Sequence, residues 1–290
     1  MPSIELIKPL PPIGPLEQVT ESQLARYAEL IYRRTGIRVS PQKRMLLSNR
    51  LRRRLRETGI KDFEEYYQHL RKLRPDDPEW DAFLQEITTH ETYLFRDEAQ
   101  WAWFSTAFLP QHAAEAAEVL GKRSLRIWSA ACSTGDEPVT IACCVAASLP
   151  NLARWKVHVL GTDIGVTAIE QARSAVFGER AMRLVPEDYR VRFFQAVRPG
   201  LWQPRPLLTD MIAYRRHNLM EPLRDPPFDL AMVKNVLIYF DGASKKVVMD
   251  NVRAAIRPGG LLVAGAAEGL GELVKDFTRL QPWLYRRPLR

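Results

Sequence analysis

The sequence of 290 residues has only three cysteines, and two of them, Cys143 and Cys144, are adjacent. Three cysteines cannot all pair, and neighbouring cysteines rarely meet the geometry of a disulfide. We therefore expect reduced, buried cysteines, which are typical of the cytoplasm. The first residues also lack the charged and then apolar layout of a secretion signal, which favours the same location.

Other absences narrow the function. No uninterrupted apolar run approaches the roughly 20 residues of a membrane-spanning helix. The five histidines show no metal-ligand spacing with one another or with cysteine, so we expect no metal site. No Ser/His/Asp or Cys/His arrangement for nucleophilic catalysis is visible either. The sequence therefore points away from membrane-spanning proteins, metalloenzymes and enzymes with a catalytic triad.

Positive charge is present in excess and is unevenly distributed. The net charge is +8, and residues 1–80 hold 16 basic against 11 acidic side chains, which accounts for +5 of it. This asymmetry predicts an acidic partner for the N-terminal part of the chain.

Capping residues in the N-terminal part predict short helices. Thr20 and Gln23 form a capping box at the start of the first helix, and Gly36 ends it. Three further helices are predicted to begin at Ser40-Pro41, Asp62 and Asp77-Pro78. We expect a proline-rich tail with little structure at residues 1–16, a basic all-α domain at 17–88 and an α/β domain at 89–290.

Strand and helix patterns alternate after Leu125. Strands are predicted at 125–130, 157–162, 228–234, 261–266 and 282–287, and helices at 137–149, 166–174, 187–195 and 243–256. Such alternation predicts an α/β fold with a doubly wound, mostly parallel sheet. The prolines and the strand-like MIAYRR sequence in residues 198–216 predict a small antiparallel β insertion beside it.

A nucleoside site is predicted where the first strand ends. A small-residue loop leads to Gly135, the acids Asp136 and Glu137, and an apolar helix. The next strand ends at Asp163, where a carboxylate can bind ribose hydroxyls. The alternative is that Asp163 caps the following helix. The loop is not GxGxxG, and Glu137 stands where a pyrophosphate would lie, so we expect the cationic nucleoside S-adenosylmethionine as cofactor.

Two later segments contain further strand borders of the predicted sheet. The strand within Phe228–Phe240 is followed by polar Lys234 and Asn235 and by Tyr239, at the edge of the sheet where ligands bind. The segment Ile256–Leu262 reads as a helix end and a tight turn into the next strand.

Four segments together resemble the chemotaxis receptor glutamate methyltransferase family (CheR). They are Thr88–Arg96 (TTHETYLFR), Trp128–Pro138 (WSAACSTGDEP), Asp229–Asp241 (DLAMVKNVLIYFD) and Arg257–Gly260 (RPGG). They occur in the family's order and spacing, and the resemblance extends from about residue 21 to residue 285. It implies methyl transfer from S-adenosylmethionine to glutamate side chains of chemoreceptor-type proteins, which forms methyl esters.

The resemblance also assigns site residues. Its cofactor contacts fall on His90, Thr92, Arg96, Glu137, Asp163, Asn218, Leu219, Lys234 and Asn235. It further places Arg96 and Tyr239 near the transferred methyl group. Three positions depart from the family pattern: His90 replaces an asparagine, Lys234 replaces an arginine, and Gly265-Ala-Ala-Glu268 replaces Gly-His-Ser-Glu.

The second predicted helix carries a cluster of basic residues with no acid between positions 43 and 56. We interpret Lys43, Arg50, Arg53, Arg54 and Arg56 as the substrate-binding residues. The cytoplasmic helical region of a chemoreceptor or a similar glutamate-rich protein is the expected partner, without direct membrane insertion. The alternative for the basic helix is a solvated face. The alternatives for the protein are a nucleic-acid methyltransferase, which would use the helix on phosphates, and an S-adenosylmethionine-binding scaffold or regulatory protein.

Overall fold

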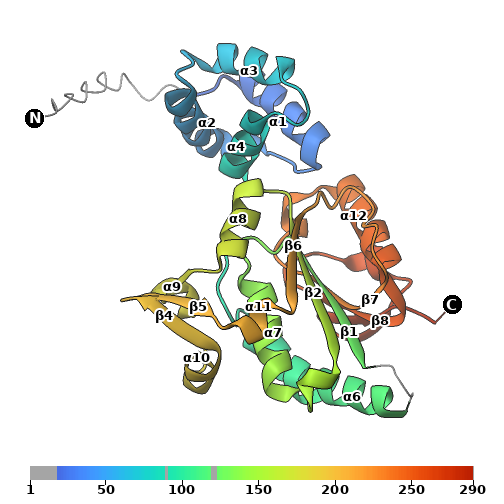
Figure 1. Cartoon of the computed structure of the whole chain (residues 1–290). Coiled ribbons are helices and arrows are strands. Elements are labelled where there is room, and N and C mark those ends of the chain that lie inside the picture. Colours follow the sequence, from blue (N-terminus) through green and yellow to red (C-terminus); the bar gives the residue numbers. More distant parts are fainter. Residues whose placement is uncertain (1–17, 89–90, 119–122, 290) are drawn as a thin grey trace, which may run out of the picture.

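A computed structural model describes residues 18–88, 91–118 and 123–289, and the predicted tail at 1–16 lies outside them. Four helices form the N-terminal part: α1 (Glu21–Thr35), α2 (Arg44–Thr58), α3 (Phe63–Lys72) and α4 (Pro78–Ile87). A single turn of 3-10 helix, η1 (Pro41–Lys43), precedes α2. Figure 1 shows these helices as a separate layer above the sheet.

The caps predicted at Thr20, Asp62 and Asp77 are confirmed, whereas the start predicted at Ser40-Pro41 coincides with η1: Ser40 makes no capping hydrogen bond, and α2 begins at Arg44. Thr20 and Gln23 form the capping box of α1, and Gly36 ends the helix in the left-handed conformation. Asp62 and Asp77 accept hydrogen bonds from the first turns of α3 and α4. The inward faces of the helices bury a shared core of Tyr27, Ile31, Leu51, Tyr66, Leu70 and Phe83, each with 0% exposure.

The remaining chain is built on a seven-stranded sheet. Its strands are β1 (Ser124–Ala130), β2 (Lys156–Asp163), β6 (Ile212–Arg216), β7 (Phe228–Val233), β8 (Ile256–Ala264), β9 (Thr278–Gln281) and β10 (Leu284–Arg286). Their order is β6-β2-β1-β7-β8-β10-β9, and the first five run parallel while β10 is antiparallel to both neighbours. The chain moves outward from β1 to β6 and then returns to the other side of β1, so β1 and β7 form the switch point of the sheet.

Helices cover both faces of this sheet. Side chains alternate along β1, so that Leu125 and Ile127 join one core and Trp128 and Ala130 join the other. The first core includes α5 (Glu98–Trp103), η2 (Phe104–Phe108), α6 (Leu109–Glu118) and α7 (Asp136–Ser148), and the second includes α12 (Gly242–Ala255). The sheet domain also contains the helix α8 (Val166–Ser174) and the short turns η3 (Leu152–Arg154), η4 (Leu237–Tyr239) and η5 (Gly271–Val274). The doubly wound α/β prediction is confirmed.

The predicted insertion at 198–216 is wrong in its limits. The small antiparallel sheet has the order β3-β5-β4 and consists of β3 (Phe177–Gly178), β4 (Phe194–Arg198) and β5 (Leu201–Pro204), with α9 (Glu179–Met182) and α10 (Glu187–Phe193) between its strands. After α11 (Pro206–Thr209), the MIAYRR segment forms β6, which pairs in parallel with β2. Its alternating pattern was correctly read as a strand, but such a pattern does not specify the sheet.

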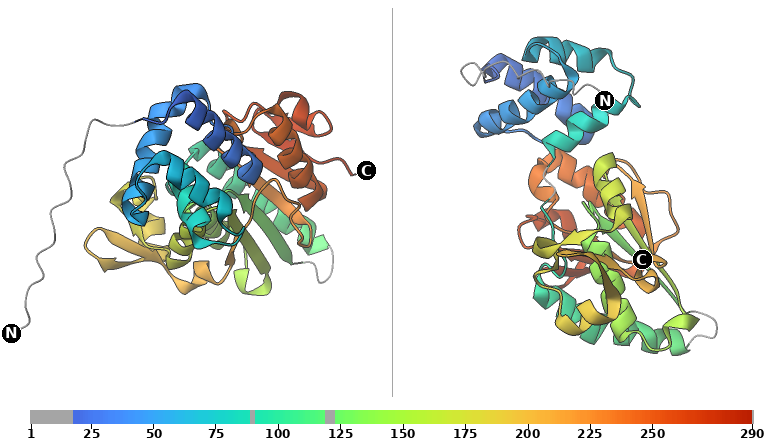
Figure 2. Two further views of the ribbon diagram at one scale, coloured as in Figure 1. Left: turned by 90° about the horizontal axis from the view of Figure 1, so that it is seen from above. Right: turned by 60° about the vertical axis from the view of Figure 1, so that its left-hand side comes forward.

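The helical domain contacts the sheet domain directly above the carboxyl ends of the parallel strands (Figures 1 and 2). The Arg38 amide donates to the Tyr239 carbonyl at 2.9 Å, and an isolated β-bridge joins Ile37 to Phe240. An ion pair between Arg216 and Asp81, 2.5 Å long, links the two domains on the other side. In the described residues, no helix combines the length and the apolar character needed to cross a membrane.

Candidate functional site

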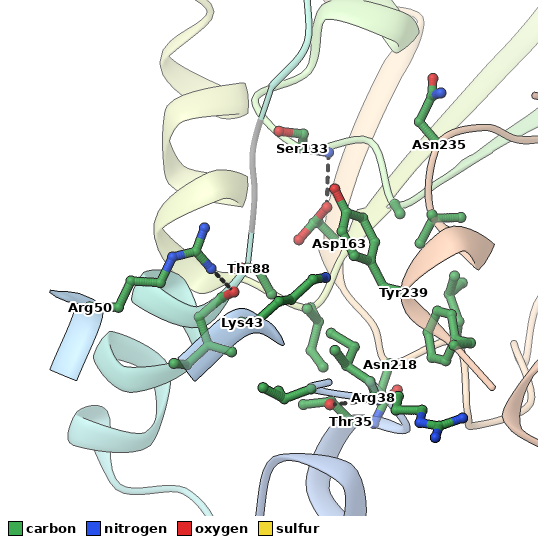
Figure 3. A pocket seen from close by; sticks show the side chains of 18 of the residues that line it. Thr35, Arg38, Lys43, Arg50, Thr88, Ser133, Asp163, Asn218, Asn235 and Tyr239 are labelled. Carbon is green, nitrogen blue, oxygen red and sulfur yellow. Dashed lines mark hydrogen bonds between the residues drawn. The ribbon is translucent and has the colours of Figure 1, made fainter. Parts of the chain in front are cut away.

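Two adjoining hollows lie at the switch point, between the strand ends and the helical domain. The larger one is mostly apolar and includes Asp163, Leu219 and Tyr239, whereas the smaller one includes Thr92, Arg96, Glu137 and Lys234. Both are lined by Ala131, Ser133 and Asn235, so they are two parts of one crevice. Figure 3 shows the larger part, with Asp163 and Tyr239 facing the same space.

The backbone around the crevice is held in unusual conformations. Ala131, Ser133 and Asn235 have positive φ angles of 58°, 51° and 57°, in the left-handed region that non-glycine residues seldom adopt. Gly135 has φ of 90°, and a Cβ atom there would lie 2.7 Å from the Tyr214 hydroxyl. Such strain is characteristic of functional sites, and here it brings the chain between β1 and α7 close to the crevice.

Asp163 ends β2 at the floor of the larger hollow and is 6% exposed. One carboxylate oxygen accepts from the Ser133 amide at 2.9 Å (Figure 3), and the other accepts from the Gly165 amide at 2.9 Å. Each oxygen keeps a lone pair for a ligand. The alternative role as a helix cap is not realised, because Gly165 occupies the N-cap position of α8.

A charge cluster around the buried Lys234 side chain lies at the smaller hollow. The Lys234 ammonium lies 3.1 Å from an Asp97 carboxylate oxygen and 3.3 Å from one of Glu137, and its side chain is only 5% exposed. The Ser129 hydroxyl donates to the other oxygen of Glu137 at 2.7 Å. Glu137 and Lys234 line the hollow together with Arg96, so the hollow presents a carboxylate beside two cationic groups.

Asp97 was not singled out from the sequence as a site residue. The Asp97 carboxylate binds Lys234 and not the adjacent Arg96. Arg96 donates to the Glu91 carbonyl at 3.0 Å, and its guanidinium lies 5.7 Å from the centre of the Tyr93 ring. The only sequence signal for Asp97 was its position next to Arg96. Spacing in the sequence does not reveal that Asp97 pairs with Lys234, 137 positions away.

Asn218, one of the predicted cofactor contacts, connects the two domains. The Asn218 side chain donates to the Arg34 carbonyl of the helical domain at 3.1 Å and accepts from the Met220 amide at 3.1 Å. Leu219 is 6% exposed and lies in the wall of the larger hollow. His90, the remaining predicted cofactor contact, lies outside the described residues.

Tyr239 faces the larger hollow from η4 and Lys43 faces it from the helical domain. The Lys43 ammonium lies 5.6 Å from the centre of the Tyr239 ring, within the range of a cation–π contact. Arg96 lines the smaller hollow, and the two hollows meet at Asn235. Arg96 and Tyr239, both assigned to the methyl group by resemblance, therefore line the two adjoining parts of one crevice.

The basic helix α2 does not present all its predicted residues to solvent. Arg54 is buried, with 8% exposure, and binds Glu79 at 2.6 and 3.1 Å. Its assignment to a substrate-binding surface is therefore corrected: it is part of the core of the helical domain. The sequence of this helix grouped Arg54 with Arg50 and Arg53, but it contained no information on the position of α4, which supplies Glu79.

The other basic residues of this set remain accessible. Arg53 has 61% of its side chain exposed and lies 3.3 Å from Glu86, and Arg56 and Lys43 are exposed. Arg50 is half-buried, donates to the Ile87 carbonyl and lines the larger hollow (Figure 3). The set thus extends from the mouth of the crevice along α2.

Cys132 lies beside the crevice but is not suited to be a nucleophile. Burial raises the pKa of its thiol well above the usual value, and nearby Asp163 raises it further. The thiol therefore stays protonated at neutral pH. Among the described residues there is also no group of three or more His, Cys, Asp or Glu that could hold a metal ion.

The crevice fits S-adenosylmethionine by its own chemistry. The larger hollow combines apolar walls with the Asp163 carboxylate, as a nucleoside requires. The smaller hollow combines the Glu137 carboxylate with the cations of Lys234 and Arg96, as the ammonium and carboxylate of an amino-acid portion require.

Comparison with known proteins agrees with this reading. Residues 90–283 match the SAM binding domain of CheR methyltransferases, and residues 22–88 match the all-alpha domain of the same family. The chemotaxis protein methyltransferase of Salmonella typhimurium is 33% identical over 266 residues, which cover 90% of this chain and 88% of that protein. That of Borreliella burgdorferi is 28% identical over 275 residues, covering 93% and 95%. With both domains matched in order, and with a crevice suited to S-adenosylmethionine, the chain belongs to the CheR family of S-adenosylmethionine-dependent methyltransferases.

Proposed function

We propose that this methyltransferase modifies the side-chain carboxylates of glutamate residues in chemoreceptor-type proteins and forms glutamyl methyl esters. Its relatives from Salmonella typhimurium and Borreliella burgdorferi are chemotaxis protein methyltransferases. The observation that carries the proposal is that two hydrogen-bond donors, Arg96 and Tyr239, line the crevice. They can orient a carboxylate acceptor, which needs no general base.

The acceptor chemistry explains this requirement. A glutamate carboxylate is ionised at neutral pH, so it is already a nucleophile. Bound S-adenosylmethionine supplies an activated methyl group. The protein must hold the carboxylate in line with that group and remove part of its water shell.

Arg96 and Tyr239 are suited to orient the acceptor. The Arg96 guanidinium can donate a charge-assisted hydrogen bond to one carboxylate oxygen, and the Tyr239 hydroxyl can donate to the other. Stronger hydrogen bonds would lower the nucleophilicity of the carboxylate, so we assign both residues the role of orienting the acceptor. Glu137, Asp163 and Lys234 then hold the cofactor, with Thr92, Asn218, Leu219 and Asn235 lining its site.

The accessible basic residues are assigned to the protein substrate. Lys43 and Arg50 stand at the crevice, and Arg53 and Arg56 continue the positive surface along α2. A helical receptor region rich in glutamate would match this surface in charge. On this assignment the domain formed by residues 17–88 recognises the substrate, and residues 89–290 carry the chemistry.

Methyl transfer from tritiated S-adenosylmethionine tests the proposal. The purified protein should label membranes that contain chemoreceptors, and mild base should release the label, because esters hydrolyse where amides and methylated bases do not. RNA added in place of membranes should stay unlabelled. Base-stable label, or label on RNA, would contradict the proposal, and cofactor binding without any transfer would support a regulatory or scaffold role.

A further inference from the structure

One buried carboxylate outside the assigned residues supports the crevice from behind. Glu268 follows β8 and is 0% exposed. One of its oxygens accepts from the Asn235 amide, and the other accepts from the Leu237 amide at 2.7 Å. Burial raises the pKa of this carboxyl, whereas the hydrogen bonds from the Leu237 and Asn235 amides oppose the rise. A buried carboxylate is tolerated only with such partners, so this arrangement is specific.

One amide belongs to Asn235, in the turn between β7 and η4, and the other to Leu237, the first residue of η4. Asn235, two residues after the end of β7, has φ of 57°, a conformation that costs about 1 kcal/mol or more and persists only where the surroundings hold it. The turn brings Asn235 to the junction of the two hollows and leads directly to Tyr239. Two amides, two residues apart, donate to the one Glu268 carboxylate, and these hydrogen bonds fix the turn in this shape.

Gly265 leaves room for the carboxylate. A Cβ atom at this position would lie 2.6 Å from the Glu268 oxygen and 3.1 Å from the Asn235 nitrogen. The Gly265 amide itself donates to the Val233 carbonyl at the end of β7, at 3.1 Å. The end of β8, the end of β7 and the turn therefore meet around Glu268.

We propose that Glu268 is a positioning residue for the cofactor crevice, which acts by holding the Asn235–Leu237 turn in its left-handed shape. It touches neither cofactor nor acceptor. The inference rests on the proposed placement of the cofactor against Asn235.

Two variants test this role from different directions. Glu268→Gln keeps the size of the side chain but puts an amide nitrogen against a backbone N–H, whereas Gly265→Ala keeps the carboxylate and displaces it. Both should weaken binding of S-adenosylhomocysteine by about tenfold, the effect of losing a hydrogen bond to a charged group. The matched controls are Glu272→Gln, an exposed acid in η5, and Gly242→Ala, where an added Cβ has nothing within 4 Å.

The readouts are calorimetric affinity and the amide resonances of Asn235 and Leu237. In both variants these two resonances should shift strongly, while resonances of the α2 helix and the Michaelis constant for the protein substrate stay unchanged. If Glu268→Gln does not fold, Gly265→Ala decides the question alone. Wild-type affinity and unshifted resonances in Gly265→Ala would overturn the inference. A wild-type protein that does not bind S-adenosylhomocysteine would instead overturn the cofactor site itself.

Discussion

The crevice and the α2 helix both carry many charges, but they use them differently. In the crevice, Lys234, Glu137 and Asp163 are largely buried, and each is fixed by named partners at 2.7 to 3.3 Å. Along α2, Arg53 and Arg56 are exposed. Fixed, desolvated charges suit a small ligand of defined shape, whereas exposed charges suit a variable, acidic macromolecular surface.

Arg54 shows that sequence position alone does not decide between these uses. It lies one residue from Arg53, yet its side chain is 9% exposed and its partner Glu79 is 15% exposed. The same helix therefore holds one structural arginine beside arginines available for binding. The predictions below separate these three kinds of charge, from the largest expected effect to the smallest.

Removal of Arg54 should have the largest effect, and it should act on stability. Arg54→Met leaves Glu79 without its buried partner, so the free energy of unfolding should fall by about 3 kcal/mol. Denaturant unfolding measures it. Arg53→Met is the matched control and should change stability by less than about 0.5 kcal/mol. Equal, small effects of both variants would show that Arg54 is a surface residue like its neighbour.

Asp163→Ala should weaken S-adenosylmethionine binding by about 2 kcal/mol, or roughly 30-fold, because hydrogen bonds to a charged group are lost. Calorimetry on the folded variant measures this change. The Michaelis constant for the receptor should not change, because Asp163 lies on the floor of the cofactor hollow. Unchanged cofactor affinity would rule out Asp163 as the ribose ligand.

Arg96→Lys should lower turnover by about tenfold while the fold and cofactor affinity are retained, since lysine keeps the charge but loses the planar fork. Steady-state kinetics with saturating cofactor measure the change. Arg180→Lys, an exposed arginine of α9, serves as the control. Wild-type kinetics in Arg96→Lys would remove Arg96 from the methyl-transfer site.

Charge reversal on α2 should have the smallest effect at physiological salt. Arg53→Glu with Arg56→Glu should raise the Michaelis constant for the receptor several-fold and leave cofactor affinity unchanged. Activity of the wild type should fall between about 50 and 300 mM salt, and the variant should lose this dependence. If neither charge reversal nor added salt changes the Michaelis constant or the activity, the arginines form a solvated face.

The sequence was informative wherever the signal was local. Thr20, Asp62 and Asp77 predicted their helix starts, because capping depends on residues within one turn. Asp163 and Lys234 were predicted at strand ends, and parallel strands necessarily bring such ends to one edge of a sheet. The element order therefore located the crevice before any side-chain geometry was known.

The failures all involve contacts between distant segments. Arg54 pairs with a residue of another helix, Asp97 with a lysine at the end of β7, and Glu268 with the turn that follows β7. The strand at 212–216 was recognised, but its pairing with β2 depends on the path of the whole chain. The periodicity of apolar residues describes one helix or strand at a time, so it does not predict which residues of different elements contact each other.

Hydrogen–deuterium exchange with and without S-adenosylhomocysteine tests the central distinction most directly. The ligand should slow exchange at residues 131–137, 163–165 and 233–237, which surround the crevice, and leave residues 52–58 of α2 unchanged. Protection that appears along 52–58, or that is missing from the three crevice segments, would contradict the separation of cofactor binding from substrate recognition.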